Sequence, residues 1–333
     1  MEEDQGDHEV IYYSFPPIYN QTCPWLLIFQ GEHFEKHIFY SVDENRYYSR
    51  TIPEMRRKYL LASSHGWLLL ADCFKDDCFL LNPQSKEKIQ LPLLKSKYQL
   101  EERTVIVDYR KAKFVFSKPP TDPECHILLI CDLGRLLLFC KLGDEKFTVQ
   151  SATFGNDHIS TALVFQGKVY ALLKPSYKIA TIDFNAADSA IEVQPLIKDG
   201  RPCAVPRRPS VLSSQHFEEY LVESFDELLC IRKIYSAFFA KEVSDFEIFR
   251  VDLCNMECEV LDALGERTIF LSNGMSYSTI AAISRTVRNS VYYTETGEKN
   301  LFLYELEDRS KTILQACPNE GSDWLGQCWV LMH

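Results

Sequence analysis

One kind of hairpin recurs along the whole chain: an apolar or aromatic strand, a short polar turn, and a second strand. The six clearest copies span residues 39–50, 79–92, 138–150, 180–195, 249–263 and 302–314. Their first residues are 40, 59, 42, 69 and 53 positions apart. This is close to the roughly 40–50 residues per blade of β-propellers, stretched where loops are long. The pattern predicts an all-β fold of repeated blades.

We expect a single β-propeller of six blades, each with four antiparallel strands; seven blades is the alternative. Segments 66–72 and 135–140 are almost uniformly apolar, which is typical of strands buried on both faces of a sheet. The strands are predicted at 25–29, 37–42, 46–52, 57–64, 66–72, 78–82, 87–92, 113–117, 126–132, 135–140, 146–151, 160–166, 168–174, 178–184, 190–196, 219–224, 227–234, 246–253, 257–263, 268–272, 278–283, 289–294, 301–306 and 312–316.

Both ends of the chain, and two internal segments, carry further expectations. A strand at 10–15 is predicted to pair with one at 328–332, because joining the two ends would close the ring and remove open sheet edges. Residues 1–9 contain five acidic residues and are predicted to form a disordered tip, leaving 10–333 as the propeller domain. Helical turns are predicted at 53–59 and 93–103.

The charge of the chain limits its partners. The formal net charge is -11 and the isoelectric point is about 5.3, so the surface repels phosphate backbones and we expect no nucleic-acid binding. The longest apolar stretch, 127–140, is interrupted by Asp132, Gly134 and Arg135. It is too short and too polar for a membrane span.

The cysteines favour an intracellular protein. There are 12 of them, mostly inside apolar strands, where free thiols behave as small hydrophobic side chains. The N-terminus shows neither a basic region nor an apolar region of the kind that makes a secretory signal. We therefore expect a cytoplasmic or nuclear location, or both.

Several of these segments, in this order, resemble the KIB-type β-propeller family of plants, a domain commonly found behind an F-box. The matching segments include Pro24-WLLIF, Ser63-SHGWLLL, Ala162-LVFQGKVYAL, Tyr220-LVESFDELLCIRK and Leu264-GERTIFLSNGMSYS. The resemblance covers about residues 24–307. It implies a propeller that recognises proteins, like the substrate-recognition domain of F-box proteins in cullin-RING ubiquitin ligases.

The chain departs from the full-length plan of that family at its N-terminus. The residues before Pro24 are acidic and contain no Leu-Pro opening and no amphipathic helices. We therefore expect no F-box within this chain, and the sequence gives no basis for Skp or cullin association. The predicted partner is a protein of unknown identity, bound by a non-enzymatic propeller.

No pattern in the chain predicts a catalytic centre, a cofactor or a metal. Gly-x-Ser-x-Gly and the phosphate-binding glycine motifs are absent. His33-x-Glu35-x-His37 has the wrong spacing for a helical zinc site, and Cys254-x3-Cys258 supplies only half of a structural zinc site. The alternative function is an enzyme or carbohydrate-binding propeller with a polar axial pocket, recognisable by His, Asp and Glu clustered at the channel mouth.

One surface patch is predicted to contact a partner. The segment Pro202-CAVPRRP lies in a proline-rich loop predicted at 197–216 between two blades, and such loops project from a face of a propeller. Arginine is enriched at binding hot spots. Arg201, Arg207 and Arg208 are therefore the predicted patch.

Overall fold

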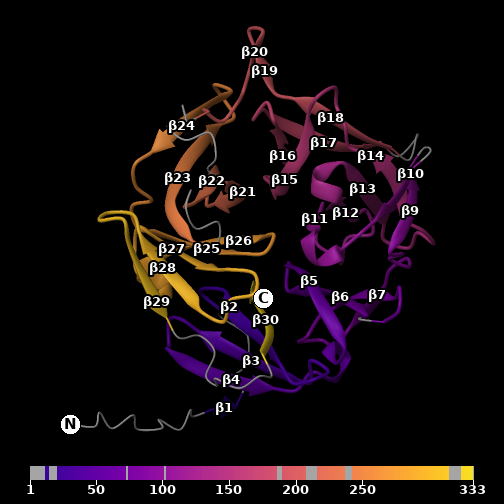
Figure 1. Ribbon diagram of the computed structural model, residues 1–333, viewed down its shortest axis with the longest axis vertical. Helices are drawn as coiled ribbons and strands as arrows, with labels where there is room; N and C mark the ends of the chain where they lie inside the picture. The colour runs from indigo at the N-terminus through magenta and orange to yellow at the C-terminus, as the bar shows by residue number, and fades with distance from the viewer. Residues whose placement is uncertain are drawn as a thin grey trace.

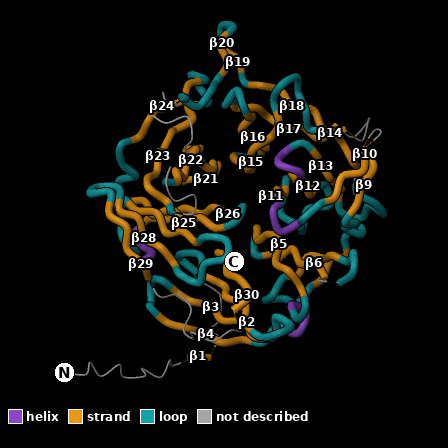
Figure 2. The backbone as a smooth tube through the Cα atoms, in the orientation of Figure 1, coloured by secondary structure: helices purple, strands orange, loops and turns teal. Residues whose placement is uncertain are grey.

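Six β-sheets surround a central axis and form one closed ring (Figure 1). The computed structural model describes residues 12–14, 21–72, 74–100, 103–185, 190–207, 216–236, 242–314 and 324–332. Nearly all of the regular structure in these ranges is strand, with helix confined to short turns (Figure 2). The prediction of a six-bladed all-β propeller is confirmed. The predicted acidic tip at 1–9 lies outside the described residues.

Blades two to five each contain four consecutive antiparallel strands, as predicted. Blade two is β5 (Lys58–Ser64), β6 (Trp67–Asp72), β7 (Cys78–Leu81) and β8 (Lys88–Gln90); blade three is β11 (Lys113–Phe116), β12 (His126–Cys131), β13 (Leu136–Lys141) and β14 (Thr148–Ser151); blade four is β15 (His158–Phe165), β16 (Lys168–Lys174), β17 (Ile179–Asn185) and β18 (Ala190–Pro195); blade five is β21 (Phe217–Ser224), β22 (Glu227–Tyr235), β23 (Val243–Asp252) and β24 (Glu257–Leu261).

Blade one joins the two ends of the described chain, but not by the predicted pairing. It contains β30 (Trp324–Val330), β2 (Trp25–Gln30), β3 (Lys36–Ser41), β4 (Arg46–Arg50) and β1 (Tyr12–Ser14), in that order from the axis outward. The prediction that β1 pairs with β30 is wrong, because they occupy opposite edges of one sheet: β30 pairs with β2, and β1 pairs in parallel with β4. Trp329 and Val330 are fully buried, as suits the crowded innermost position.

Blade six has five strands, one more than the general plan of four per blade, in agreement with the five strands predicted between residues 268 and 316. The order is β26 (Met275–Ile280), β25 (Arg267–Ser272), β27 (Ser290–Thr294), β28 (Leu301–Glu305) and β29 (Ser310–Leu314). The hairpin of β25 and β26 folds towards the axis, so β26 is innermost and β25 pairs in parallel with β27. The short helix α1 (Ala281–Ser284) begins the connection back to β27.

The connections between blades contain two additional hairpins. The helical turn predicted at 93–103 is wrong: β9 (Lys97–Leu100) and β10 (Arg103–Ile106) pair there instead. Tyr98 is buried between exposed neighbours, so period-two burial decides the structure over the helix propensity of the charged residues. β19 (Ile197–Lys198) and β20 (Arg201–Pro202) form the second hairpin, which projects from the outer edge of the ring (Figure 1).

Three single turns of 3-10 helix complete the described elements. They are η1 (Pro53–Met55), η2 (Tyr109–Lys111) and η3 (Asp132–Gly134). The helical turn predicted at 53–59 is present only in its first half as η1, because β5 already begins at Lys58.

The core of the described part of the chain consists of six apolar clusters, one for each interface between neighbouring blades. Leu69 belongs to the interface of blades two and three, and Leu137 to that of blades three and four. Both leucines are buried. Burial of apolar surface contributes roughly 25 cal/mol per Å², so the stacked faces of the blades are the main stabilising contribution.

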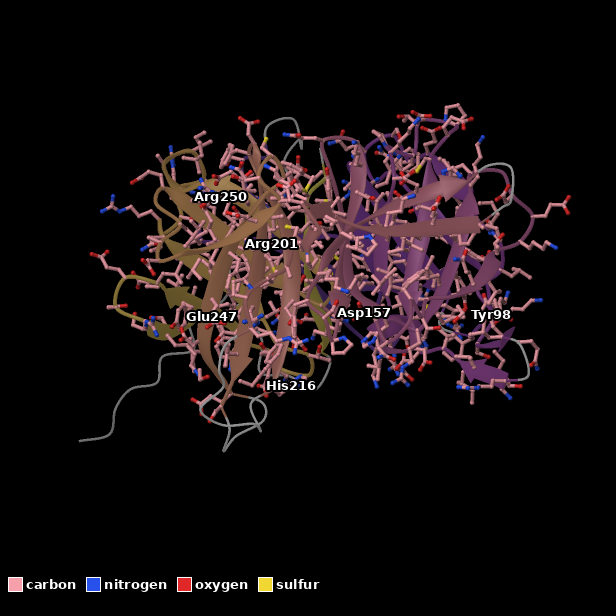
Figure 3. All side chains as sticks on the ribbon, turned by 90° about the horizontal axis from the view of Figure 1, so that it is seen from above. Tyr98, Asp157, Arg201, His216, Glu247 and Arg250 are labelled. Carbon is pink, nitrogen blue, oxygen red and sulfur yellow. The ribbon has the colours of Figure 1, made fainter. Side chains whose placement is uncertain are left out.

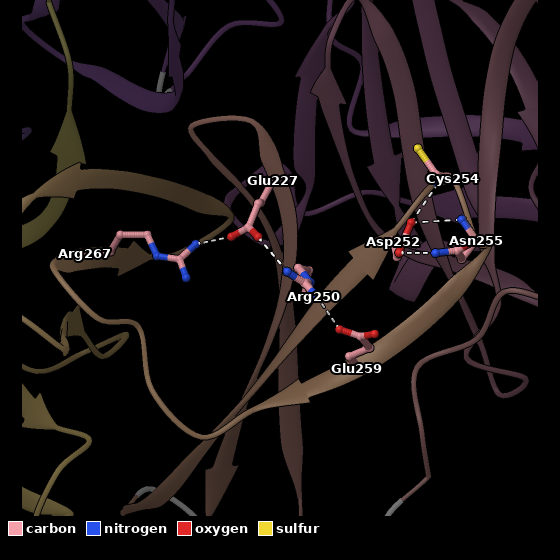
Figure 4. Close-up of polar contacts among 7 residues, drawn as sticks. All are labelled: Glu227, Arg250, Asp252, Cys254, Asn255, Glu259 and Arg267. Atoms are coloured by element: carbon pink, nitrogen blue, oxygen red, sulfur yellow. Dashed lines mark hydrogen bonds and ion pairs between the residues drawn. The ribbon is translucent and has the colours of Figure 1, made fainter.

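The ring has two distinct faces (Figure 3). We call the face where the innermost strands β5, β11, β15 and β21 begin the start face, and the opposite one the end face. His216, directly before β21, lies at one side of the ring, and Arg250, near the end of β23, lies toward the other. On the end face, Glu227 pairs with Arg267 at 2.5 Å and with Arg250 at 3.2 Å, which ties blade five to blade six (Figure 4).

Candidate functional site

A cavity of about 650 Å³ occupies the axis of the ring. It is lined by residues of the innermost strands of blades two to six and by Leu331, which follows β30. The lining combines aliphatic side chains with aromatic rings and small hydroxyls. The aromatic residues are Phe114, Phe116, Tyr220, Phe225 and Tyr277, and the hydroxyls are those of Ser63, Ser64, Thr161, Ser276 and Ser278.

Some of these hydroxyls are used to join blades. Ser276 donates a hydrogen bond to the backbone oxygen of Leu221 over 2.7 Å, and Ser278 and Ser224 share one over 2.9 Å. Both bonds connect β26 to β21, so they fix the wall between blades five and six. The wall is thus held by buried polar contacts as well as by apolar packing.

The mouth of the cavity on the end face carries an exposed aromatic side chain. Phe225 is the first residue of the two-residue turn between β21 and β22, with a φ of 58° and 52% of its surface exposed. Glycine is preferred at a hairpin position of this kind, and a bulky residue with positive φ costs on the order of 1–3 kcal/mol. The fold therefore holds a large apolar group at an unfavourable position, in solvent, beside the cavity.

Two ionisable residues also line the cavity at its end-face mouth, Glu223 from blade five and His65 from blade two. Glu223 and His65 are both exposed, and the imidazole Nδ1 of His65 lies 2.9 Å from the hydroxyl of Ser64. Partial burial raises the pKa of the Glu223 carboxyl and lowers the pKa of the His65 imidazole. The end-face mouth therefore combines an apolar ring with one carboxyl group.

Lys113 reaches across the start-face end of the axis. Its ammonium donates to the backbone oxygen of Glu219 over 3.3 Å and lies 5.8 Å from the centre of the Tyr220 ring. Lys113 belongs to blade three and the other two to blade five, so the side chain spans blade four's position. Burial lowers the pKa of Lys113 to about 8, although Glu218 and Glu219 partly offset this.

Below this cation lies a network of buried charges. The carboxylate of Glu219 is completely buried and contacts the Lys174 ammonium at 2.5 Å and the Arg232 guanidinium at 3.9 Å. Arg232 also pairs with Glu247 at 2.8 Å and donates to the backbone oxygen of Pro206 over 3.2 Å. Removing one member of such a network leaves an uncompensated charge, which is costly.

A second group of charges centres on Lys233. Its side chain is 3% exposed and pairs with Glu295 at 2.8 Å and with Glu218 at 3.0 Å. Burial alone would lower the pKa of Lys233, but the two carboxylates outweigh it and the pKa is raised. Tyr220 and Tyr235 donate to these carboxylates. The start-face rim is thus a set of compensated charges, whereas the end-face mouth is apolar with one carboxylate.

The structure places the predicted arginine patch as follows. Arg201 lies exposed on β20, at the projecting hairpin. Arg207 donates to the backbone oxygen of Pro175 over 2.6 Å, and its guanidinium carbon lies 5.5 Å from the centre of the Tyr177 ring. Arg208 lies outside the described residues. Arg207 therefore also supports the connection between blades four and five.

The two metal motifs weighed from the sequence have other roles in the structure. His37 is buried, and its Nδ1 accepts a hydrogen bond from the backbone N–H of Ile52 over 3.2 Å. Burial lowers the pKa of His37 to about 4. Cys258 contacts Cys203 instead of Cys254, at 3.7 Å between the sulfur atoms. Across the described ranges, no three His, Cys, Asp or Glu side chains gather to hold a metal ion.

Sequence reasoning missed the residues that distinguish the two ends of the cavity. Phe225 carried a signal, because an aromatic residue in the polar turn Glu223-SFDE interrupts the usual composition of a hairpin turn. The sequence contains no comparable signal for Lys113. The groups that surround it come from blade five, more than a hundred positions away in the chain.

Comparison with known proteins identifies the family. The sequence model described as the KIB1-4 beta-propeller matches residues 39–305. The chain belongs to this family. Its segments and blade order agree with the resemblance found in the sequence.

Three Arabidopsis thaliana proteins illustrate the relationship. F-box/kelch-repeat protein At1g57790 is 26% identical over 86% of this chain and 75% of its own length. Putative F-box protein At5g66830 is 20% identical over 93% of this chain and 83% of its own. F-box protein KIB2 is 25% identical over 52% of this chain and 42% of its own. The chain is therefore a β-propeller domain related to plant F-box proteins.

Among solved structures, the β-propeller domain of Myceliophteria thermophila Cps50 (Swd1) aligns with 88% of this chain and 80% of its own, with 13% identity and a TM-score of 0.39. So low a score adds nothing to the fold that the strand pairings already show. Separately, no helix in the described part of the chain has the length and apolar character needed to cross a bilayer.

Proposed function

We propose that this chain is a non-enzymatic protein-recognition propeller that binds a segment of a partner protein at the end-face mouth of its axial cavity. The observation that carries the proposal is Phe225. An exposed phenylalanine at a turn position that favours glycine destabilises the free protein, and aromatic residues at the edge of a cavity are typical anchors of interfaces.

The surroundings of Phe225 indicate the chemistry of the bound segment. The cavity offers aromatic side chains and hydroxyls for an apolar side chain of the partner, and Glu223 offers a carboxylate at the mouth. The net charge of -11 favours approach of a basic segment. The proposed ligand is therefore an extended protein segment that carries one apolar and one basic side chain.

The alternative, an enzyme or carbohydrate-binding propeller, requires several acidic and histidine side chains around the cavity. Of the acidic and histidine residues, only Glu223 and His65 are among the described residues that line the cavity. One carboxyl group from blade five and one imidazole from blade two, on opposite sides of the axis, support recognition better than catalysis. This is why we propose a binding role.

The relatives suggest the biological setting. Similar chains are F-box proteins. We therefore propose that this chain presents the bound protein to a ubiquitin ligase as a substrate, or that it holds the protein as an adaptor without a ligase. All ten cysteines in the described residues are free thiols, which supports the proposed cytoplasmic or nuclear location.

A pair of glycine substitutions tests the binding site. Phe225→Gly removes the ring at a position where glycine is favoured, so folding stability is expected to be kept or raised while partners are lost. Leu133→Gly is the matched control, since Leu133 is 82% exposed with a φ of 55° and lies on the start face. Capture from a plant extract with both variants and the wild type, followed by quantitative mass spectrometry, gives the comparison.

The proposal expects a set of proteins held by the wild type and by Leu133→Gly but lost with Phe225→Gly. Equal capture by all three proteins would refute the end-face site. Skp and cullin subunits captured alongside that set support presentation to a ligase, whether or not they depend on Phe225, whereas that set without them supports an adaptor.

The predicted arginine patch remains a second contact surface that we propose for the same partner. Arg201 is exposed on the projecting hairpin, and Arg207 lies in the connection that follows it. Replacing Arg201, Arg207 and Arg208 together by Ala is expected to weaken partner capture. Unchanged capture would remove the patch from the proposal without affecting the end-face site.

A further inference from the structure

Two cysteines, one in the connection between blades four and five and one on blade five, meet near the outer edge of the ring. Cys203 follows β20 in the connection between blades four and five, and Cys258 lies on β24, the outer strand of blade five. Their Sγ atoms are 3.7 Å apart. A disulfide requires an S–S distance of about 2.05 Å. The two sulfur atoms must therefore approach each other by about 1.7 Å to form the bond.

The two partners differ in how firmly they are held. Cys203 is fully buried. Its N–H donates to the oxygen of Leu196 and its own oxygen accepts from Ile179, each over 2.8 Å. Cys258 is half-buried, and its strand is paired on one side with β23. β24 is an edge strand of its sheet, so it is the element that can move towards Cys203.

We propose that Cys203 and Cys258 form a reversible disulfide when the protein meets a low-molecular-weight disulfide such as oxidised glutathione. The proposal is independent of the partner site at Phe225.

The disulfide forms in two thiol–disulfide exchange steps. In the resting pair a hydrogen bond joins the two thiols, and either sulfur can be its donor. The accessible Cys258 thiol passes its proton to solvent and attacks, as the thiolate, one sulfur of glutathione disulfide; one glutathione leaves as the thiolate. Cys203 then attacks Cys258, its proton passes to the second glutathione as it leaves, and the new S–S bond remains.

The bond would have a defined mechanical effect. It would join the connection that carries Arg201 and Arg207 to the outer strand of blade five, where Lys198 already donates to the backbone oxygen of Cys254 over 3.3 Å. Because a cross-link restricts the unfolded chain, oxidation is expected to raise the melting temperature, and reduction is expected to reverse it.

Cys254 provides a matched control. It lies four residues from Cys258, exposed in the turn that follows β23, where its N–H donates to Asp252 (Figure 4). Exposure alone would make Cys254 react first with glutathione. The inference instead requires an intramolecular bond to the half-buried Cys258.

The test uses the full chain incubated in buffers of fixed oxidised to reduced glutathione ratio, alkylated, digested and mapped by mass spectrometry. We expect a linked peptide pair containing Cys203 and Cys258 in the wild type and in Cys254→Ser. In Cys203→Ser, Cys258 should accumulate as the mixed disulfide with glutathione. In Cys258→Ser, neither product should form at these positions.

Several results would overturn the inference. They are a persistent mixed disulfide on Cys258 of the wild type, a bond from Cys258 to Cys254, and a reduced Cys203 under conditions that oxidise Cys254. If Cys203→Ser fails to fold, Cys258→Ser decides the question, because its altered side chain is half-exposed. A rise of melting temperature with oxidation in the wild type but not in Cys258→Ser completes the support.

Discussion

The hydroxyl of Tyr277 donates a hydrogen bond to the backbone oxygen of Ser63 over 3.0 Å, across 214 positions of the chain. Tyr277 lies on the innermost strand of blade six and Ser63 on that of blade two, so the bond passes beside blade one, which closes the ring. The indole N–H of Trp329 on β30 donates to the oxygen of Leu271 over 3.1 Å in the same region. Closure therefore depends on side-chain hydrogen bonds that link blade six to blades one and two, as well as on the β2–β30 pairing.

Tyr277→Phe tests the role of this hydroxyl. The change keeps the ring of the side chain but leaves the Ser63 oxygen without its donor, so we expect a loss of about 1–2 kcal/mol of unfolding free energy. Urea denaturation measures it. Tyr170→Phe is the control, because the Tyr170 hydroxyl makes no hydrogen bond within the described part of the chain. An equal loss in both variants would show that the bond to Ser63 adds nothing.

A buried charge should destabilise the interface between blades three and four. Leu137 is fully buried there, so Leu137→Asp places a carboxylate in an apolar environment and is expected to cost several kcal/mol, on the order given for unpaired buried charges. Thermal unfolding followed by circular dichroism measures the effect. Leu133→Asp is the nearby control. Leu133 is 82% exposed with a φ of 55°, a conformation that Asp tolerates better than Leu, so no destabilisation is expected.

The apolar strands made most of the architecture predictable. Segments such as 66–72 and 135–140 could be assigned to blades because sheets stacked in a ring are buried on both faces, and that requirement is visible in the residues themselves. The closing strand was misassigned for the opposite reason. The apolar residues around Trp329 identify a buried strand, but pairing with β2 or with β1 depends on which edge of blade one faces the axis. The amino-acid composition of these strands does not determine which edge of blade one faces the axis.

The candidate sites were less predictable because they depend on contacts between distant segments. Cys258 was compared with Cys254, its neighbour in sequence, whereas its structural neighbour Cys203 lies 55 positions away. Arg207 is predicted to contact a partner. It is exposed, but its side chain also donates to the backbone oxygen of Pro175 and lies near the Tyr177 ring of blade four. Phe225 could have been found from sequence, since it occupies a turn where polar residues or glycine are expected.

His37 should make the protein sensitive to mild acid. Its folded pKa is about 4, lowered by burial, against an ordinary value near 6.5. Between these values the unfolded chain binds a proton that the folded chain does not, so stability falls as the pH falls from 6.5 to 4. At about 1.4 kcal/mol for each pH unit, the full effect is about 3 kcal/mol. Unfolding free energy measured from pH 7 to pH 4 gives the curve.

The comparison variant is His37→Asn, whose side-chain oxygen can accept from Ile52 as Nδ1 does. It is expected to be less stable at pH 7, because ring packing is lost, but to decline less between pH 6.5 and 4. His216→Asn should decline as the wild type does. A parallel decline in all three proteins would assign the acid sensitivity to other titrating groups, among them His65, whose pKa is also lowered by burial.

Lys113 should make the folding stability depend on pH above pH 8. Its folded pKa is about 8, lowered by burial, whereas an exposed lysine has a pKa near 10.5. At pH 7 both states are protonated and the fold bears the cost of burying the ammonium. Between pH 8 and 10.5 the unfolded chain binds the extra proton, so the stability of the wild type rises with pH relative to a variant without this amine.

Lys113→Met keeps the length of the side chain and removes its charge. At pH 7 the variant is expected to be more stable than the wild type by about 1–3 kcal/mol, and the difference should shrink by pH 10. Lys111→Met, at an exposed position two residues earlier, should change stability little at either pH. If Lys113→Met is instead less stable by the same amount at both values, the contact with the Glu219 backbone outweighs the burial cost, and Lys113 is a structural bridge across the axis at every pH.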